Sequence, residues 1–354
     1  MVGKGPNFRI SVVIPNRNRR IQVVRAVLSV LENSQVSEII VVDDCSDMDL
    51  SVEYGMLETM GVMIFRQTTH SGGGAARNRG ARECTGTHVC FLDSDDVWMP
   101  GRGLRLQAFY SRDDNDRTIL VSSALLHDDG EVQKPFQPEW KTGSSLIEYV
   151  YRDMGRVQTS MMCVPVDLVR AYPWNEDLRV NQDTDLAMRM SRAGVGFHID
   201  QEPGIIKDET LEDGRVTTGR ETADRSYAWY QRESGDWSPA ARSGYHLQDR
   251  VWRLADAGRR REGFVALANT LNPPVCLRES ARRALAMLSG PRVYKWLRTA
   301  YRGYVGHGRA TNVALRSARQ RWRDLDARAK SLCDAAQVPV TPSITCQHLK
   351  LKKD

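Results

Sequence analysis

The sequence predicts an α/β fold with a mostly parallel central sheet, followed by a helical extension. Strand-like and helix-like segments alternate through the first hundred residues. The strand-like segments are almost continuously apolar and β-branched, as expected of parallel strands that are buried on both faces. Two of these segments end in aspartates. Because ligands of such sheets bind beyond the carboxyl ends of the strands, a ligand site is expected there.

Four segments in the first hundred residues are predicted strands: 10–15, 38–44, 62–65 and 88–93. Between the first two, residues 19–34 place apolar side chains at helical spacing. Before the fourth strand, residues 75–86 predict a helix that ends near Gly86. Connections of this length favour right-handed crossovers between parallel strands.

After Asp96 the pattern becomes less regular. Residues 117–126 predict a strand, and residues 160–169 predict a strand that runs into the start of a helix. Residues 181–194 predict a short helix, with Asn181 as its N-cap. From about residue 221 the chain is helical and rich in arginine, so we expect two domains, 1–220 and 221–354. Residues 319–330 are expected to form a solvated helix.

Composition and charge agree with a folded protein of two unlike halves. Of 354 residues, 41% are hydrophobic and 27% are charged, as in globular proteins. The net charge of +6 conceals an asymmetry. Residues 1–220 contain 25 Lys and Arg against 32 Asp and Glu, a net of −7, and residues 221–354 contain 25 against 12, a net of +13. The two halves are therefore expected to have different partners.

The cysteines and the apolar segments predict a cytoplasmic protein. Seven cysteines, an odd number without a CxxC pair, favour a reducing compartment. The apolar run near the N-terminus is too short for a secretory signal. No stretch approaches the roughly 20 apolar residues that a membrane-spanning helix needs.

The stretch HVCFLDSDDVWMP, residues 88–100, ends an apolar run in three aspartates. In an extended segment, residues two apart point to the same side, so Asp93 and Asp95 can converge while Ser94 faces away. One or two carboxylates together with substrate phosphates usually hold Mg²⁺ or Mn²⁺. A solvated turn, in which Asp and Ser are common, is the alternative. A second strand that also ends in aspartates favours the metal site.

Four motifs, in this order, resemble those of family 2 glycosyltransferases with the GT-A fold. They are SVVIPNRNR, EIIVVDDCSD, SGGGAARNRGARECTGTHVCFLDSDD and VNQDTDLAMRMSRAG, and the resemblance covers about residues 9–205. It implies a GT-A nucleotide-diphospho-sugar transferase of the hexosyltransferase class. It also implies a UDP-sugar donor, Mn²⁺ or Mg²⁺ as cofactor and a saccharide acceptor.

The same resemblance assigns roles to residues at the strand ends. Asp44 would hydrogen-bond the uracil of the donor, and Pro15 would lie beside the nucleotide. Asp93, with Ser94, would face the ribose and the sugar, and Asp95 would coordinate the metal ion. The alternative for Asp44 is a structural role in a turn that caps the next element. For Asp43, the first aspartate of the VVDD pair, we prefer this structural role.

The glycine loop HSGGGAARNRG, residues 70–80, is not a dinucleotide-binding fingerprint, because the sixth position of the GxGxxG pattern is Arg77 instead of glycine. It is not a phosphate-binding P-loop either, because it lacks the GK[ST] ending. Its glycines permit close approach of the backbone to a ligand. A helix starting near residue 75 would direct N–H groups at an anion. By the resemblance, Gly74, Arg77 and Asn78 line the nucleotide pocket. The alternative is a surface loop followed by a helix with solvated arginines.

Two acids, Asp183 and Asp185, lie near a predicted helix start, where carboxylates complement the helix dipole. Asp185 fits that structural role. The resemblance makes Asp183 the general base that deprotonates the acceptor hydroxyl. The related motif usually reads Glu-Asp, whereas Gln182 stands here, which removes one like charge and should leave the pKa of Asp183 less raised. One displacement opposite the UDP leaving group would invert the anomeric centre.

Residues 293–305 predict an amphipathic helix with an aromatic stripe and cations beside it. Packing onto the catalytic domain is one interpretation. The other is peripheral contact with the anionic inner face of the cell membrane, with a lipid-diphosphate-linked saccharide as acceptor. Nucleic acid is not expected as a partner, because no RNA- or DNA-binding motif is present.

The sequence therefore predicts an inverting, metal-dependent glycosyltransferase for exopolysaccharide or surface polysaccharide assembly. A nucleotidyltransferase is the alternative enzyme, but it needs a glycine-rich fingerprint after the first strand, and residues 16–20 contain no glycine. A non-catalytic nucleotide-sugar-binding protein is the third possibility. The presence of both Asp95 and Asp183 speaks against it.

Overall fold

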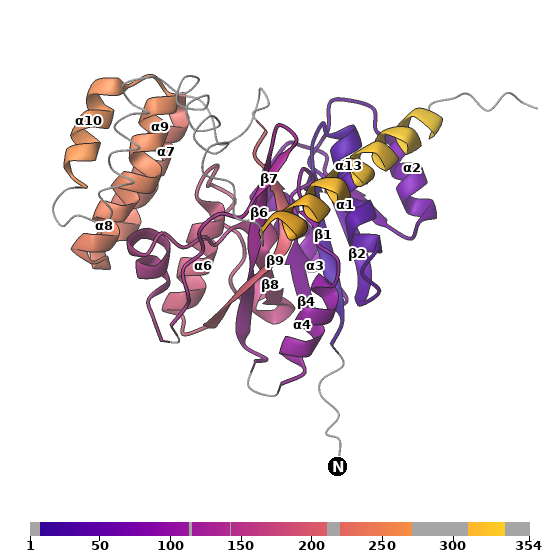
Figure 1. Cartoon of the computed structure of the whole chain (residues 1–354), viewed down its shortest axis with the longest axis horizontal. Coiled ribbons are helices and arrows are strands. Elements are labelled where there is room, and N and C mark those ends of the chain that lie inside the picture. Colours follow the sequence, from indigo (N-terminus) through magenta and orange to yellow (C-terminus); the bar gives the residue numbers. More distant parts are fainter. Residues whose placement is uncertain (1–7, 113–114, 142, 211–219, 271–310, 337–354) are drawn as a thin grey trace, which may run out of the picture.

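The computed structural model describes residues 8–112, 115–141, 143–210, 220–270 and 311–336 (Figure 1). Its centre is a sheet in the order β3-β2-β1-β4-β8-β6-β9-β5, with β7 paired to β6. The strands are β1 (Ile10–Asn16), β2 (Val36–Asp43), β3 (Met63–Arg66), β4 (His88–Phe91), β5 (Val97–Trp98), β6 (Thr118–Asp128), β7 (Glu131–Gln133), β8 (Met162–Pro165) and β9 (Gly196–Asp208).

The four predicted N-terminal strands form one parallel group. β1 lies between β2 and β4 and pairs with both in parallel, and β3 extends the group in parallel beyond β2. Antiparallel pairings of β8 with β4 and β6 then continue the sheet. The apolar residues of β1 and β2, such as Val12 and Ile40, are fully buried. The predicted α/β class with a mostly parallel sheet is confirmed.

Helices cover the sheet, and the first of them lies where the apolar spacing predicts a helix. In the helix after β1, Val23, Val24 and Val27 are fully buried and hold it against the sheet. The helix after β3 is built from small residues because it lies close to β1, where a Cβ on Gly80 would overlap Val13. These helices are α1 (Arg20–Leu31), α2 (Ser51–Thr59), α3 (Gly73–Glu83), α4 (Arg102–Tyr110), α5 (Val166–Ala171) and α6 (Gln182–Arg192).

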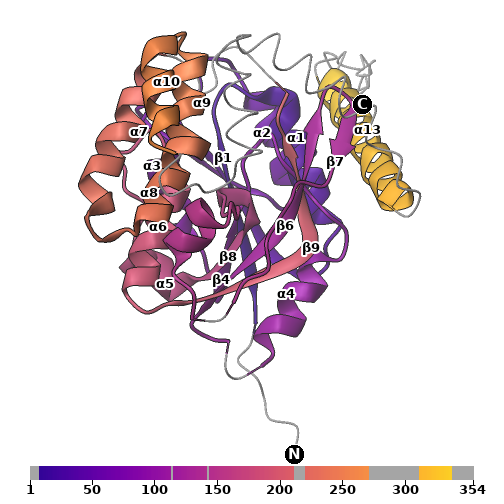
Figure 2. The same ribbon diagram turned by 60° about the vertical axis from the view of Figure 1, so that its left-hand side comes forward.

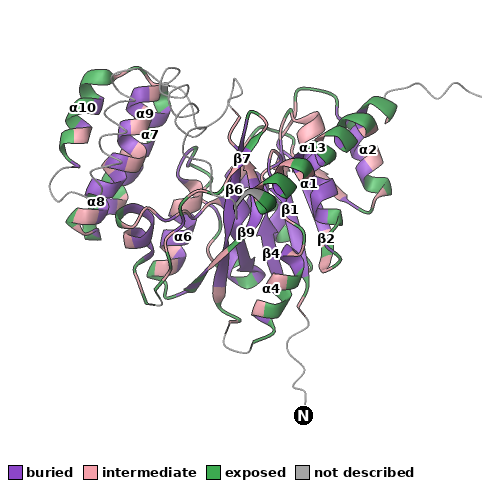
Figure 3. Ribbon diagram, in the orientation of Figure 1, coloured by how far each residue is buried: buried purple, intermediate pink, exposed green. Residues whose placement is uncertain are grey.

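The helical C-terminal region lies on two sides of the sheet domain. Helices α7 (Arg220–Glu233), α8 (Pro239–Tyr245), α9 (Val251–Asp256) and α10 (Arg260–Ala268) form a layer beside α6, whereas α13 (Thr311–Ala336) lies on the other side, against α1 (Figures 1 and 2). Figure 3 shows buried residues in the sheet and on the inner faces of these helices. The amphipathic stretch 293–305 lies outside the described residues. No helix that the structure describes is both long and apolar enough to cross a membrane.

Helix α13 corrects the expectation of a solvated helix over residues 319–330. Its face of Ala318, Trp322, Leu325, Ala329 and Cys333 is buried, at spacings of three and four residues. Arginines lie between these positions in the sequence and hide the apolar stripe, which is continuous only on the surface of the helix.

Candidate active site

An acidic cluster follows β4 at the carboxyl edge of the sheet. The chain turns sharply there, and the N–H of Asp96 donates to the carbonyl of Asp93 at 2.9 Å. One carboxylate oxygen from each of Asp93, Asp95 and Asp96 lies within 4.8 Å of the other two. The structure therefore brings Asp93 and Asp95 together and adds Asp96 to them, while Ser94 is buried in the turn.

Three cations face this cluster. Arg19, at the start of α1, contacts the Asp95 carboxylate at 2.9 Å, and Arg77, on α3, contacts that of Asp93 at 2.6 Å. Lys207 lies on β9, where burial alone would lower its pKa. Attraction to Asp96, Asp93 and Asp95 outweighs burial, so the pKa of Lys207 is raised.

The carboxylates respond to these surroundings in different directions. Burial raises the pKa of Asp93, but Arg77 and Lys207 more than offset it, and the net pKa is lowered. Asp96 is fully buried, and burial raises its pKa to about 7, with Lys207 opposing and the two neighbouring aspartates reinforcing the rise. Its Oδ1 accepts from the N–H of Asp208 at 3.0 Å. Its Oδ2 makes no well-formed hydrogen bond with a described residue.

The cluster has the chemistry of a site for a divalent cation. All of its donors are oxygens, which suit Mg²⁺ and Mn²⁺. Two ligands of one Mg²⁺ lie at most about 4.2 Å apart, so the 4.8 Å spread needs only a small rotation of the carboxylates. Within the described part of the chain, the buried Oδ2 of Asp96 has no hydrogen-bond donor in good geometry. An ion on Asp95 would compete with Arg19 for that carboxylate.

Asp183 lies in the first turn of α6 and belongs electrostatically to the same site. Its pKa is raised, mainly by burial and also by Asp93, while Lys207 and Arg77 act to lower it. Its side chain accepts a hydrogen bond from the N–H of Thr184 at 2.9 Å. A carboxylate with a raised pKa beside a charged cluster is a common feature of catalytic sites.

Arg77 links the helix of Asp183 to the acidic cluster. One guanidinium nitrogen donates to Gln182 Oε1 at 2.9 Å and another to Asp93 at 2.6 Å. The guanidinium also lies 4.8 Å from the centre of the Trp174 ring. The neutral Gln182 thus accepts from Arg77 at the position where related motifs usually carry Glu. Asp185 instead receives hydrogen bonds from Arg189 and Trp229, in keeping with its predicted structural role.

Asp44 holds the glycine loop. Its carboxylate accepts from the N–H groups of Ser71 and Gly72 and contacts Nδ1 of His70, each at 2.8 Å. Pro15 is half-buried in β1, opposite Val42. Uracil recognition by Asp44 stays a prediction, because the described contacts of its carboxylate are all with the protein.

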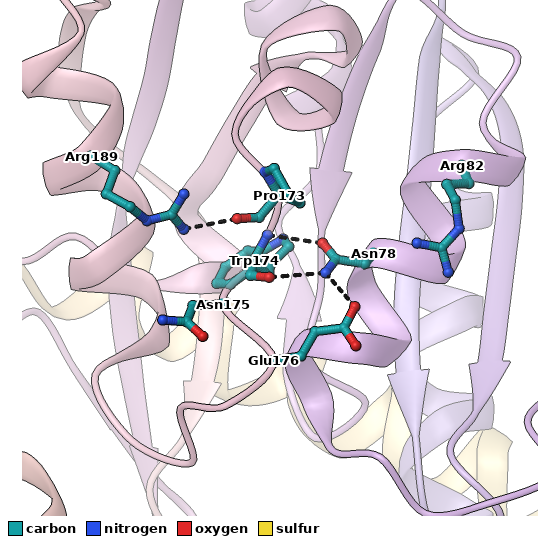
Figure 4. A pocket seen from close by; sticks show the side chains of 7 residues that line it. All are labelled: Asn78, Arg82, Pro173, Trp174, Asn175, Glu176 and Arg189. Carbon is teal, nitrogen blue, oxygen red and sulfur yellow. Dashed lines mark hydrogen bonds between the residues drawn. The ribbon is translucent and has the colours of Figure 1, made fainter.

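Gly74 and Asn78 pack against the segment before α6. A Cβ on Gly74 would come 3.1 Å from Nε2 of Gln182, so the glycine permits this close packing. The Asn78 amide donates to the carbonyl of Trp174 at 2.9 Å and to Glu176 at 2.7 Å, and it accepts from the N–H of Trp174 (Figure 4). A role of Asn78 in nucleotide binding also stays a prediction.

A cavity of about 490 Å³ opens beside Asn78 (Figure 4). The cavity is separate from the acidic cluster, because its lining includes none of the site aspartates Asp93, Asp95, Asp96 and Asp183. Its lining residues are Asn78, Arg82, Pro173, Trp174, Asn175, Glu176 and Arg189.

Two site residues, Arg19 and Lys207, were not identified from the sequence. Arg19 lies three residues beyond the end of β1, so the rule that ligands bind at strand ends could have identified it. Lys207 is a cation within the apolar run that ends β9, which is a weaker signal.

Comparisons with known proteins agree with this geometry. Residues 11–164 match the sequence model of glycosyl transferase family 2. The amylovoran biosynthesis glycosyltransferase AmsB of Erwinia amylovora is 29% identical over 210 residues, which cover 56% of this chain and 68% of AmsB. The putative colanic acid biosynthesis glycosyl transferase WcaA of Escherichia coli K12 is 32% identical over 124 residues, or 34% of this chain and 42% of WcaA.

Among solved structures, residues 1–349 of TarS from S. aureus, crystallised with UDP-GlcNAc, superpose with a TM-score of 0.53. The sequences are 13% identical, and the match covers 79% of this chain and 91% of the TarS chain, so it supports the fold. The segment that matches the family model contains the acidic cluster. Residues 11–164 are therefore similar to the family 2 glycosyltransferases, and the chain is a glycosyltransferase with the GT-A fold.

Proposed function

We propose that this enzyme transfers a sugar from a UDP-sugar to a saccharide acceptor in one inverting, divalent-metal-dependent displacement. The observation that carries the proposal is the position of Arg77, whose guanidinium joins Asp93 of the carboxylate cluster to Gln182, the residue before Asp183. The names of the relatives AmsB and WcaA, which refer to amylovoran and colanic acid biosynthesis, support exopolysaccharide or surface polysaccharide assembly as the setting.

Asp183 is proposed to be the general base. Its raised pKa means that the carboxylate holds a proton more readily than an ordinary aspartate, which suits a group that must accept one from a hydroxyl. Arg77 and Lys207 limit this rise. Arg77 also fixes the start of α6 through Gln182 and thereby orients Asp183 relative to Asp93.

The donor side is proposed to lie over the acidic cluster. Asp95, with Asp93 and Asp96, would hold Mn²⁺ or Mg²⁺, and the bound ion would neutralise charge on the diphosphate leaving group. Arg19 and Lys207 place two further positive charges next to the same carboxylates. Donor and acceptor would thus meet between the edge of β4 and the start of α6, where orientation supplies much of the rate.

The test is a screen of UDP-sugars that follows UDP release with Mn²⁺, with Mg²⁺ and with EDTA, in the presence of saccharide acceptors. We expect metal-dependent release from at least one donor, and a kcat/KM that decreases in acid with an apparent pKa above that of an ordinary aspartate. Asp183→Asn should lower kcat by about 10²- to 10⁴-fold while UDP still binds. The control is Asp177→Asn, at an exposed acid in the segment before α6.

The outcomes separate the alternatives. A protein that binds UDP-sugar but releases no UDP in the wild type would be a non-catalytic binding protein. Equal UDP release by wild type and Asp183→Asn would show that Asp183 is not the base. No metal-dependent UDP release from any donor would refute the proposed reaction. Use of a lipid-diphosphate-linked acceptor and peripheral contact with the inner face of a membrane through residues 293–305 remain predictions from the sequence.

A further inference from the structure

Helix α13 lies far from the acidic cluster in the sequence and packs against α1, α2 and β7 (Figure 1). Its contacts converge on residues 95–98, the short segment that carries two of the three clustered carboxylates and continues into β5. Three contacts or chains of contacts run from the helix to this segment.

The first chain passes through Arg25, a buried arginine on α1. One guanidinium nitrogen donates to the main-chain carbonyl of Asp95 at 2.9 Å, and another contacts Asp326 of α13 at 2.9 Å. The guanidinium also stacks on the ring of Trp322, 3.9 Å from its centre. Arg25 is therefore fixed between α13 and the backbone of the proposed metal ligand.

The second contact is direct. Arg321 of α13 donates from Nε and from a terminal nitrogen to the carbonyl of Trp98, at 3.0 and 2.9 Å. The N–H of Trp98 donates to the Ser29 hydroxyl of α1 at 2.9 Å. Both polar groups of the Trp98 backbone are thus held from the α1 and α13 side of the sheet.

The third chain reaches the side chain of Asp96. The ring of Trp322 stacks on His127, with ring centres 4.0 Å apart, and His127 Nδ1 lies 3.4 Å from the carboxylate of Asp208. The N–H of Asp208 donates to Asp96 Oδ1 at 3.0 Å. Trp322 therefore takes part in two of the three chains.

On the basis of the metal site proposed above, we propose that α13 is a positioning element of that site, which fixes residues 95–98 through Arg25, Arg321 and Trp322. Partners behind metal ligands usually affect affinity because they hold the ligands in place before the ion binds. Without them, the binding of the ion must also order the segment, and affinity is lost to that cost.

The test compares Arg321→Gln with Arg328→Gln in the full chain. Both arginines belong to α13 and both pair with Glu32, but among the described contacts only Arg321 reaches Trp98. Mn²⁺ affinity is measured by the electron paramagnetic resonance signal of the free ion, without donor or acceptor. We expect Arg321→Gln and Trp322→Leu to weaken Mn²⁺ binding about tenfold or more, and Arg328→Gln to change it less than twofold.

Hydrogen exchange of residues 95–98 in the metal-free protein is the second readout. It should become faster in Arg321→Gln but not in Arg328→Gln, and circular dichroism checks that each variant is folded. If Arg321→Gln binds Mn²⁺ like wild type, α13 only stabilises the fold and the inference is wrong, while the proposed reaction stands. If the wild type binds no Mn²⁺ even when UDP is added, the proposed metal site itself is refuted, and the inference with it.

Discussion

Ionisation of Asp96 destabilises the folded protein. It is fully buried, it adjoins two further carboxylates, and its Oδ2 makes no well-formed hydrogen bond with a described residue. Its pKa is raised to about 7, so the folded protein binds this proton more tightly than the unfolded chain does. Such a group stabilises the fold at low pH, and its contribution is lost as the pH rises from about 4 to about 7.

We predict that Asp96→Asn stabilises the metal-free protein in a pH-dependent way. Asn keeps the Oδ1 that accepts from the N–H of Asp208 but has no charge. The free energy of unfolding of the variant should match that of wild type near pH 4 and exceed it increasingly toward pH 7. The difference should grow by at most about 1.4 kcal/mol per pH unit. Urea unfolding at several pH values measures it, and a pH-independent difference would contradict the prediction.

At the residue level, the sequence predicted the groups that lie at strand ends. Asp93 and Asp95 follow an apolar strand and do lie together, although a turn brings them together rather than alternation along an extended segment. Lys207 and Arg25 could not be found in this way, because they reach the cluster from β9 and from the middle of α1. Only tertiary packing brings such distant positions together, and a local sequence pattern does not predict contacts of this kind.

At the level of elements, the regular βα units were predictable and β9 was not. The strand spans Gly196–Asp208 and contains Pro203 as well as several charged residues, so it lacks the continuous apolar pattern of β1. Its pairing with β6 also shifts register near Ser122 and Ser123. The bounds of α3 and α6 were predicted to within a few residues, because capping and glycine signals mark their ends.

The helical layer of α7–α10 holds the helix that carries Asp183. Trp229 of α7 donates from its indole N–H to Asp185 at 3.1 Å, and Arg253 of α9 donates to Asn181 at 3.2 Å. Asn181 occupies the predicted N-cap position with a φ of +61°, but its side chain makes no cap hydrogen bond to α6. The start of α6 is thus fixed by contacts from another layer rather than by its own cap.

We therefore predict that Trp229→Phe lowers kcat several-fold without changing the KM for the donor, because α6 loses one contact two residues from Asp183. The lost hydrogen bond should reduce the free energy of unfolding by about 1 to 3 kcal/mol. Steady-state kinetics and urea unfolding measure the two effects. The control is Tyr230→Phe in the same helix, whose ring stacks on Tyr245 within the helical layer. An equal decrease in kcat for both variants would show that α7 does not act through Asp185.

At the scale of the whole molecule, the basic C-terminal half and the acidic N-terminal half attract each other within the chain. The basic C-terminal half does not only face outside partners, because three arginines of α13 pair with acids of the first 220 residues. Arg321 and Arg328 contact Glu32, and Arg319 contacts Glu131. Burial would raise the pKa of Glu32, but the two arginines outweigh it and the net pKa is lowered. This attraction therefore stabilises the fold above the ordinary pKa of a glutamate and weakens in acid.

A double-mutant cycle with Glu32→Gln and Arg321→Gln tests whether this attraction stabilises the docked position of α13. The side chains are 34% and 13% exposed, so the pair is only partly screened by water. We predict a coupling free energy of about 1 kcal/mol in low salt. It should decrease in 1 M salt, where the Debye length is about 3 Å. The more exposed pair of Arg17 and Asp47 should give a smaller coupling. A coupling between Glu32 and Arg321 that salt leaves unchanged would mean that the two residues act through packing, and that the opposite charges of the two halves do not hold α13 in place.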